Sequence, residues 1–219
     1  MDASRVLSRC REPFYMEHAQ SQTPIAVFDE FLVAAEFRAL LDFTMSRRAE
    51  FVATEVIGAN GKSRPDHRQR RSCVLFELGS FHQMFVERLM TFLPQVVARL
   101  GLPWFQVSHV EAQLTMTNNG DYFRAHTDSG TGPVSKRMLT FVYFFHREPR
   151  GFTGGELRIY ATSRGSDCAT APARCRVLYP MQNQVVFFAS TVLHEIMPVV
   201  CPSADFVNSR FTVNGWLHR

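Results

Sequence analysis

Beyond Pro103 the chain breaks into short runs of β-branched, aromatic and aliphatic residues that are separated by Gly, Asn, Pro and Ser. These runs are FQVSHVEAQLTMT, RMLTFVYFFH, GELRIYAT, QVVFFAS and SRFTVNGWLH. Short runs of this composition, bounded by turn residues, indicate strands, and several in succession indicate a sandwich or a barrel. The second half of the chain is therefore predicted to be a β-domain.

The first half differs, because two of its segments, 28–51 and 81–100, carry apolar residues at helical spacing. Pro94 lies inside the second segment and is expected to kink or interrupt that helix. No internal repeat, linker or low-complexity tract marks a second domain, and one β-barrel domain can reach 219 residues. We expect one domain, with residues 1–105 supplying helical support and a flap loop and residues 106–219 forming the core barrel.

Composition excludes several classes of protein. Hydrophobic residues make up 46% and charged residues 20% of the chain, and no apolar run approaches the roughly 18 residues that span a bilayer. The N-terminus lacks the apolar core of a secretory signal. Five cysteines, an odd number without a close CxxC pair, argue against a disulfide framework and a structural zinc site. These features predict a protein of the reducing cytoplasm that does not span a membrane.

Two of the eight histidines have informative neighbours. His126 and Asp128 form His-Thr-Asp, and residues i and i+2 of a strand point to one face, so an imidazole and a carboxylate could share a metal ion. The spacing alone is weak, because a lone histidine is more often a satisfied or solvated side chain. His194 follows the run QVVFFAST and, on its own, could simply end a core strand. Two histidines and one carboxylate on one face of an iron ion would leave three positions open for a chelating cosubstrate and dioxygen.

A polar stripe in the last apolar run adds a second signal. Strand alternation places Arg210, Thr212 and Asn214 on one face. A guanidinium and a hydroxyl directed inward could hold a terminal carboxylate, the guanidinium in bidentate fashion. The order His-x-Asp, then His, then Arg-x-Thr is more specific than any of its members.

In this order of motifs the sequence resembles the iron(II)/2-oxoglutarate dioxygenase superfamily and, within it, the prolyl-hydroxylase-like branch. The likeness runs from about Glu111 to the C-terminus through GDYFRAHTD, RMLTFVYFF, GGELRIY, VVFFASTVLHEIMPV and SRFTVNGW. It implies a mostly β fold with packed helices (α+β), in which N-terminal helices cover a double-stranded β-helix of the jelly-roll or cupin type. The double glycine at 154–155 also fits the family, although such a pair is more often a turn or a bulge.

The resemblance also implies a set of ligands and cosubstrates. Iron(II) would be the metal, 2-oxoglutarate and dioxygen the cosubstrates, and ascorbate a reductant that such an enzyme can use. The catalytic residues, which are also the metal ligands, would be His126, Asp128 and His194. The residues that hold the distal carboxylate of 2-oxoglutarate would be Arg210, Thr212 and Thr140.

Two positions depart from the family pattern. Relatives often carry one tyrosine about ten residues before the first metal histidine and another on the strand with Arg-x-x-Thr, here residues 137–140. Met116 and Phe144 occupy these places in this chain. The carboxylate anchor should then depend more on Arg210 and Thr212.

The sequence does not identify the substrate. The implied reaction hydroxylates an unactivated C–H bond with release of succinate and carbon dioxide, and the branch points first to a prolyl or other amino-acid residue in a protein or peptide. A free amino acid or a small peptide metabolite is the close alternative. A nucleic-acid dealkylase is less expected, because those enzymes typically carry a second Arg where Trp216 stands. A non-catalytic β-barrel binding protein would not need the triad and the anchor, and a halogenase usually lacks the carboxylate that Asp128 supplies.

A basic loop stands out in the first half. Between Lys62 and Arg71 five basic residues accompany one acidic residue, a balance of 5 − 1 = +4 that equals the net charge of the chain. We interpret residues 58–72, between two expected strands, as a flap over the iron that recognises substrate. The expected substrate residues are Tyr122, Arg68, Arg70 and Arg71. The alternative is that these residues form a solvated surface loop, because runs of charged residues usually lie on a solvated face.

Overall fold

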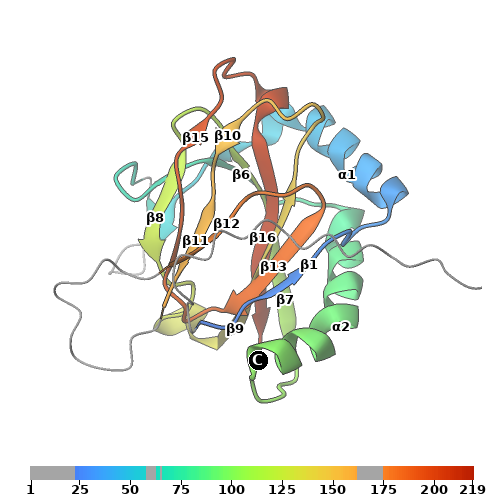
Figure 1. Ribbon diagram of the computed structural model, residues 1–219, viewed down its shortest axis with the longest axis vertical. Coiled ribbons are helices and arrows are strands. Elements are labelled where there is room, and N and C mark those ends of the chain that lie inside the picture. The colour runs from blue at the N-terminus through green and yellow to red at the C-terminus, as the bar shows by residue number, and fades with distance from the viewer. Residues whose placement is uncertain (1–22, 58–62, 65, 162–174) are drawn as a thin grey trace, which may run out of the picture.

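Two antiparallel sheets form the body of the molecule (Figure 1). The larger sheet runs in the order β1 (Ala26–Phe28), β13 (Gln184–Ala189), β9 (Arg137–Phe145), β16 (Arg210–His218), β7 (His109–Thr117), β6 (Cys73–Leu75) and β2 (Val52–Ala53). The smaller sheet runs in the order β12 (Cys175–Leu178), β11 (Leu157–Tyr160), β14 (His194–Ile196), β8 (Tyr122–His126) and β5 (Arg70–Arg71). The separate strand pairs are β10 (Thr153–Gly154) with β15 (Val199–Val200) and β3 (Val56–Ile57) with β4 (Ser63–Arg64).

These elements come from a computed structural model that describes residues 23–57, 63–64, 66–161 and 175–219. Within the described residues, strands form in every one of the apolar runs expected to contain one. The short 3-10 helices of the connecting segments are η1 (Arg48–Glu50), η2 (Gly132–Lys136) and η3 (Phe206–Asn208).

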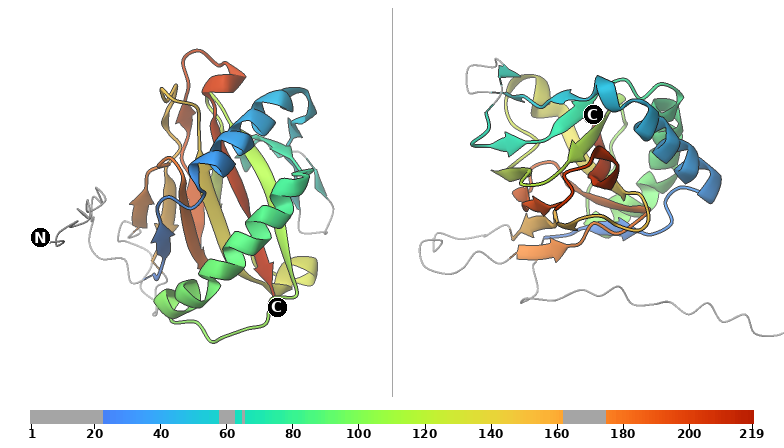
Figure 2. Two further views of the ribbon diagram at one scale, coloured as in Figure 1. Left: turned by 90° about the vertical axis from the view of Figure 1, so that its right-hand side faces the viewer. Right: turned by 90° about the horizontal axis from the view of Figure 1, so that it is seen from above.

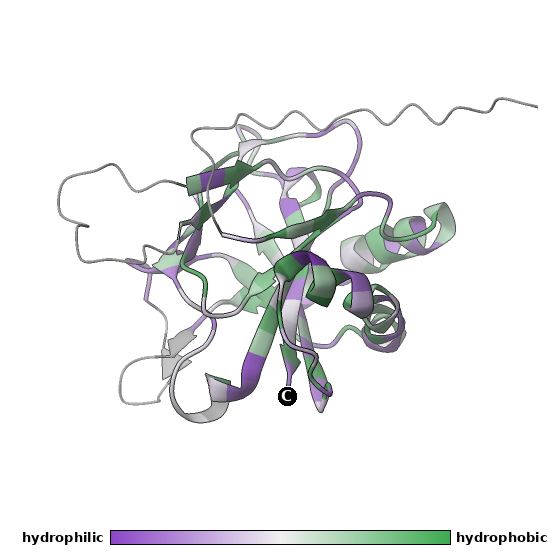
Figure 3. Ribbon diagram, turned by 60° about the horizontal axis from the view of Figure 1, so that its bottom comes forward, coloured by the Kyte–Doolittle hydropathy of each residue, from purple (hydrophilic) through white to green (hydrophobic). Residues whose placement is uncertain are grey.

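Strand β9, an interior strand of the larger sheet, is buried on both faces, which is why its sequence is apolar without alternation. Phe141 and Tyr143 point to one face and join the main hydrophobic cluster with the helices. Val142 and Phe144 point to the other face and pack against residues of the smaller sheet, including Leu157. Figure 3 shows hydrophobic colour along the central strands. The hydrophobic cluster that includes Val142, Phe144 and Leu157 therefore packs between the two sheets and holds them face to face.

Helices α1 (Ala34–Ser46) and α2 (Ser80–Leu100) lie together on the outer face of the larger sheet (Figure 2, left). α2 buries a stripe that includes Phe85, Leu89 and Leu93, and these side chains enter the main cluster. No helix within the described residues is long and apolar enough to cross a membrane.

The two expected helices differ from the sequence prediction in their details. α2 is one helix from Ser80 to Leu100, so Pro94 does not interrupt it. Buried residues on both sides of the proline hold the helix on the sheet and offset the hydrogen bond that proline cannot donate.

The first helix is shorter than the expected 28–51 because the residues before it have other partners. Phe28 belongs to β1, which pairs with β13. The Asn183 side chain then binds Leu32, accepting from its N–H (2.9 Å) and donating to its carbonyl (2.8 Å). Glu36 accepts a hydrogen bond from the Val33 N–H (3.1 Å), and the helix begins directly after this residue.

The first 105 residues supply strands as well as helices. The strands β1, β2 and β6 extend the larger sheet, and β5 closes one edge of the smaller sheet. The expected strands around the basic segment are present, since Val52 of β2 pairs with Val74 of β6. Residues 58–62 and 65 of the proposed flap lie outside the described residues.

We predict that Leu89→Ala lowers the free energy of unfolding by about 2–5 kcal/mol, because it leaves a cavity between α2 and the larger sheet. The matched control is Met90→Ala on the exposed face of the same helix (Met90 is 41% exposed), which should change stability by about 0.5 kcal/mol or less. Urea denaturation of both variants measures this difference. Equal losses would contradict the packing of α2 described above.

Candidate metal centre

Two paired strands of the smaller sheet bring together the histidines that the sequence singled out. His126 ends β8, His194 begins β14, and the two residues lie opposite each other in the register. Asp128 follows two residues beyond His126, and its carboxylate lies between the two rings. Its Oδ1 is 3.5 Å from His126 Nε2, and its Oδ2 is 3.4 Å from His194 Nε2. The three ligand atoms lie within 4.8 Å of one another, as the ligands of one metal ion must.

The structure corrects two local expectations about these residues. Asp128 does not lie on the strand with His126, because β8 ends at His126. A turn holds the carboxylate in place instead: the N–H groups of Asp128 and Ser129 both donate to the Ser190 carbonyl (2.9 Å each). His194 does not end a strand but begins β14, after the turn that follows β13.

Both histidines are oriented by backbone carbonyls. His126 Nδ1 donates to the Arg124 carbonyl (2.8 Å), and His194 Nδ1 donates to the Val192 carbonyl (2.9 Å). Since a carbonyl can only accept, each Nδ1 carries the proton and each Nε2 presents its lone pair toward Asp128. Metal-binding histidines are typically held in this way.

Charge and burial prepare the same groups for a cation. Burial lowers the pKa of His194 to about 4, so the ring is neutral near pH 7 and can act as a ligand. Burial alone would raise the pKa of the Asp128 carboxyl, but His194, His126 and a hydrogen bond from Thr140 together hold that pKa well below its usual range. Asp128 is therefore ionised near neutral pH although its side chain is only 8% exposed.

Thr140 has a different partner from the one expected. Its hydroxyl donates to Asp128 Oδ2 (2.7 Å) and lies 3.1 Å from Ser190 Oγ. The side chain lines the pocket, but the hydroxyl is already engaged by the carboxylate. Thr140 thus orients the candidate metal ligand Asp128, a role that the sequence analysis did not foresee.

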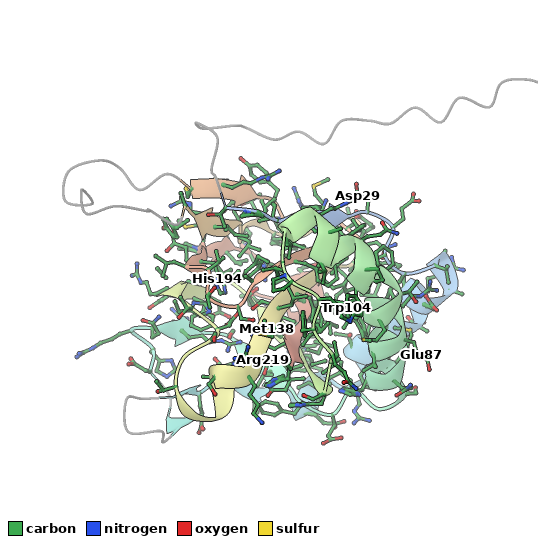
Figure 4. All side chains as sticks on the ribbon, turned by 90° about the horizontal axis from the view of Figure 1, so that it is seen from below. Asp29, Glu87, Trp104, Met138, His194 and Arg219 are labelled. Carbon is green, nitrogen blue, oxygen red and sulfur yellow. The ribbon has the colours of Figure 1, made fainter. Side chains whose placement is uncertain are left out.

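A pocket opens beside the triad. It is lined by residues of both sheets, among them His194, which is labelled in Figure 4. Its lining includes His126, Asp128, His194, Arg210, Thr212 and Trp216. The structure thus brings the expected triad and the expected carboxylate anchor into the lining of one pocket.

Arg210 is a buried cation with unused donors. It begins β16 and is 2% exposed, and its Nη1 donates weakly to Thr117 Oγ1 (3.4 Å). Its Nε and Nη2 atoms are buried and have no hydrogen-bond partner within the part of the chain that the structure describes. Burial lowers the pKa of Arg210 to about 9, so the guanidinium remains protonated near neutral pH. A buried, protonated guanidinium with free N–H groups fits a carboxylate ligand.

One glycine of the pair makes room for this arginine. A Cβ at Gly155 would lie 2.6 Å from Arg210 Cδ, and a Cβ at Gly154 would lie 2.3 Å from the Pro198 carbonyl oxygen. Gly154 has a φ of +73° and Gly155 a φ of +70°, a conformation that disfavours any side chain. Gly155 therefore serves the packing of Arg210, and Gly154 allows the close approach of the Pro198 carbonyl.

The positions of the missing family tyrosines have different environments. Met116 points away from the pocket and packs against the main hydrophobic cluster, while its neighbours Thr115 and Thr117 line the pocket. Met116 was therefore wrongly expected to lie near the cosubstrate, because strand alternation turns its two neighbours toward the pocket instead. Phe144 lies beneath Arg210, with the guanidinium carbon 5.1 Å from the ring centroid.

The basic residues expected to recognise substrate separate into two groups. Arg70 lines the pocket, lies over the Phe123 ring (4.7 Å) and donates through Nε to Ser72 Oγ (2.8 Å). Arg68 is exposed, and Arg71 is exposed with its Nε 3.6 Å from Asp121. Neither of these two lines the pocket.

Tyr122 also lines the pocket, and its hydroxyl donates to the His67 carbonyl (2.6 Å). Sequence reasoning missed Thr115, Thr117 and Phe123, all of which face the cavity. Strand alternation from the conspicuous threonines of QLTMT could have found the first two. The Phe123 ring stacks on His126 (3.5 Å between centroids), and this contact has no local signal in the sequence.

Comparisons with known proteins agree with this geometry. Residues 112–218 match the family model described as the 2OG-Fe(II) oxygenase superfamily. A relative from Synechocystis, described as an uncharacterized PKHD-type hydroxylase, is 34% identical over 191 residues, which cover 86% of this chain. The chain spans 61% of the length of that relative.

Two solved structures have the same fold. A prolyl-4-hydroxylase of Pseudomonas putida superposes with a TM-score of 0.62 at 18% identity, over 90% of this chain and 94% of the other. A prolyl hydroxylase of Trichoplax adhaerens, solved with a hypoxia inducible factor peptide fragment, superposes with a TM-score of 0.62 at 14% identity, over 90% of this chain and 84% of the other.

The fold is a double-stranded β-helix with N-terminal helices, as the sequence predicted, and a His-Asp-His group lines its pocket. Through residues 112–218 the chain belongs to the 2OG-Fe(II) oxygenase superfamily, and its fold is prolyl-hydroxylase-like. The superfamily implies iron(II), 2-oxoglutarate and dioxygen, which confirms the expected cofactors. The donor set of two neutral imidazoles and one carboxylate fits iron(II), and the unpartnered N–H groups of Arg210 fit a carboxylate of 2-oxoglutarate.

We predict that Thr140→Val weakens the affinity for iron(II), measured without oxygen, by about ten- to a hundredfold. Loss of the hydroxyl raises the pKa of Asp128 and leaves its carboxylate free to rotate away from the histidines. The control is Thr91→Val on the exposed face of α2, which should leave metal affinity unchanged. An unaltered affinity in Thr140→Val would mean that this hydrogen bond does not orient the ligand.

Proposed function

We propose that this protein is an iron(II)/2-oxoglutarate-dependent hydroxylase that acts on a prolyl or other amino-acid residue of a protein or peptide. The observation that carries the proposal is the buried, unpartnered guanidinium of Arg210 in the same pocket as the His-Asp-His group. A metal site alone would need no such cation. A metal and a carboxylate-binding arginine in one cavity suit a ligand that chelates the metal at one end and carries a second carboxylate at the other.

In this proposal the chain positions two reactants. His126, Asp128 and His194 hold iron(II) on one face, and the backbone carbonyls behind the rings fix their direction. Thr140 keeps the Asp128 carboxylate turned toward the metal. Arg210 pairs with the distal carboxylate of 2-oxoglutarate.

Thr212 faces the same pocket and completes the polar wall around Arg210. Its hydroxyl is 3.4 Å from Asn214 Oδ1, and Thr115 donates to the same oxygen (2.7 Å). Because Asn214 is already held by Thr115, the weaker contact leaves the Thr212 hydroxyl available to a carboxylate. Val142 and Ile196 supply apolar lining that limits water in the cavity.

When bound, iron(II) and 2-oxoglutarate supply the oxidising chemistry, in which dioxygen is consumed, 2-oxoglutarate becomes succinate and carbon dioxide, and one oxygen atom enters a substrate C–H bond. The chain's own contribution is to orient the reactants and to exclude water.

Among the basic residues of the flap, we assign substrate recognition to Arg70. It reaches the pocket through β5, which pairs with the metal-bearing strand β8. Burial lowers the pKa of Arg70 to about 10, and the nearby Asp128 opposes this, so the guanidinium stays charged near neutral pH. A charged donor at this wall suits a carbonyl or carboxylate oxygen of a peptide-like substrate.

The substrate class is supported by the prolyl hydroxylases that share the fold, one of which was solved with a peptide fragment. A free amino acid or a small peptide metabolite is the alternative, since Arg70 would also suit its carboxylate. A panel of prolyl peptides and free amino acids, scored by a mass gain of one oxygen atom, separates the two. Oxygen gain on free amino acids alone would contradict the peptide assignment.

The test of the function is 2-oxoglutarate-dependent formation of succinate with added iron(II). We predict that the wild-type protein forms succinate and that His194→Ala forms none above background, because two ligands no longer hold the metal on one face. His82→Ala, which removes an imidazole from α2, should retain wild-type turnover. Wild-type turnover in His194→Ala would refute the metal assignment, and no turnover in the wild-type protein with any member of the panel would refute the oxygenase function.

We predict that Arg70→Gln raises the KM for the substrate identified by the panel roughly ten- to a hundredfold, as expected for loss of one charge-assisted hydrogen bond. Arg68→Gln makes the same change two residues earlier at an exposed side chain and should leave KM within about twofold. Substrate-free turnover of 2-oxoglutarate should stay equal in the two variants. Equal KM values would assign recognition to other residues.

A further inference from the structure

A second group of two histidines and one carboxylate lies at the opposite end of strands β7 and β16 from Arg210. His109 and Glu111 stand two residues apart on β7, and His218 on β16 pairs directly with His109. The chain ends just after His218, at the end of the molecule where Figure 1 marks the C-terminus and Figure 4 labels Arg219. The arrangement repeats that of the first triad: a histidine and an acid at i and i+2, and a second histidine on the paired strand.

The three side chains share one face of the larger sheet. Residues of β7 that line the pocket, Thr115 and Thr117, have the same parity as His109 and Glu111, so strand alternation points all four to one side. The second group therefore belongs to the inner face of the barrel, beyond Trp216. It shares no residue with the first triad.

The distances suit a metal ion. Glu111 Oε1 is 2.9 Å from His218 Nε2 and 3.9 Å from His109 Nε2, and all three atoms lie within 4.8 Å of one another. Ligand atoms that surround a tetrahedral zinc ion at about 2.0–2.1 Å are about 3.3 Å apart. The two imidazole rings stack, with centroids 3.9 Å apart and an interplanar angle of 27°, so they must turn out of the stack for both Nε2 lone pairs to meet at one ion.

His218 Nε2 is an unsatisfied buried atom. The residue is 2% exposed, and this nitrogen has no hydrogen-bond partner with good geometry among the described residues, in spite of its short distance to Glu111. Such an atom is costly to bury unless something binds it. A cation between the two side chains would use the nitrogen lone pair and the carboxylate oxygen at once.

The second ring is oriented by a neighbouring hydroxyl. The Ser108 hydroxyl lies 3.4 Å from His109 Nδ1, which leaves His109 Nε2 directed at the Glu111 carboxylate.

Arg137 is the neighbour that most opposes a cation here. Its Nη2 donates to Glu111 Oε2 (2.5 Å), its Nη1 donates to the Asp128 carbonyl (3.3 Å), and its guanidinium lies over the Trp216 ring. It engages only the second carboxylate oxygen, so Oε1 remains directed at the histidines. An outer partner that holds one oxygen of a carboxylate while the other binds metal is common in metal sites.

We propose that His109, Glu111 and His218 form a second transition-metal site, separate from the iron site, that binds a zinc-like divalent cation. Two imidazoles and a carboxylate are ligands that Zn²⁺ accepts, with water in the fourth position. The ion joins the first and third residues of β7 to the last residue of β16 and stabilises that end of the sheet. Through Arg137 the site also touches the backbone of Asp128.

The test is the number of Zn²⁺ ions bound by the tag-free, metal-stripped full chain, measured by competition with a chromogenic chelator. Wild-type protein should bind two ions, one at each group. His109→Ala and His126→Ala should each bind one, and the double variant none. His67→Ala, which removes an exposed imidazole outside both groups, should still bind two.

His109 is suited to this test because its side chain is 56% exposed, so its loss should not unfold the protein. Glu111→Gln is a second variant that keeps the side-chain shape, and it should also bind one ion. In His126→Ala, added Zn²⁺ should raise the Tm by a few degrees, and it should not do so in His109→Ala/His126→Ala. A wild-type count of one, or a count of two in His109→Ala, would overturn the second site. Neither result would bear on the oxygenase function, because the iron site is counted separately.

Discussion

A buried guanidinium without a carboxylate partner is the feature around which the rest of the pocket is arranged. Removing such a cation from water costs several kcal/mol unless a counter-charge or hydrogen bonds replace its hydration. Glu156 eases this cost at a distance, and Thr117 accepts one weak hydrogen bond, but Nε and Nη2 stay unused. Gly155 clears the space that the arginine stem occupies. A fold that tolerates this arrangement is prepared for an anion, and the proposed anion is the distal carboxylate of 2-oxoglutarate.

The site depends on the packing of two sheets, because neither sheet carries all of it. The smaller sheet supplies the two histidines and Arg70, and the larger supplies Arg210, Thr212 and the threonine that holds Asp128. The apolar cluster between the sheets, which includes Phe144 and Phe188, keeps these walls at a fixed separation. Phe144 also contributes to the cosubstrate wall, because its ring lies beneath Arg210. Loss of packing there should therefore disturb the cosubstrate wall as well as the fold.

Periodicity predicted the apolar strands, and motif order named His126, Asp128, His194 and Arg210, which the structure brings to one pocket. The sequence carries no signal for a partner that comes from another strand. The hydrogen bond from Thr140 to Asp128 is one such contact, because the turn at Ser190 brings Asp128 to the hydroxyl. Arg68, Arg70 and Arg71 look alike in sequence, and only the pairing of β5 with β8 decides that Arg70 faces the pocket. His109, Glu111 and His218 went unnoticed because the pairing of β7 with β16 brings together residues that are far apart in the chain.

The central claim is that Arg210 is the anchor of 2-oxoglutarate, and calorimetric titration of 2-oxoglutarate into the iron(II)-loaded protein without oxygen tests it most directly. Arg210→Gln keeps hydrogen-bonding capacity but removes the charge, so it should weaken 2-oxoglutarate binding roughly ten- to a hundredfold while iron(II) affinity stays unchanged. Gly155→Ala should weaken 2-oxoglutarate binding in the same direction by displacing the arginine stem, whereas Gly130→Ala, where a Cβ meets only Val134 at 3.6 Å, should not. Wild-type affinity for 2-oxoglutarate in Arg210→Gln would contradict the account.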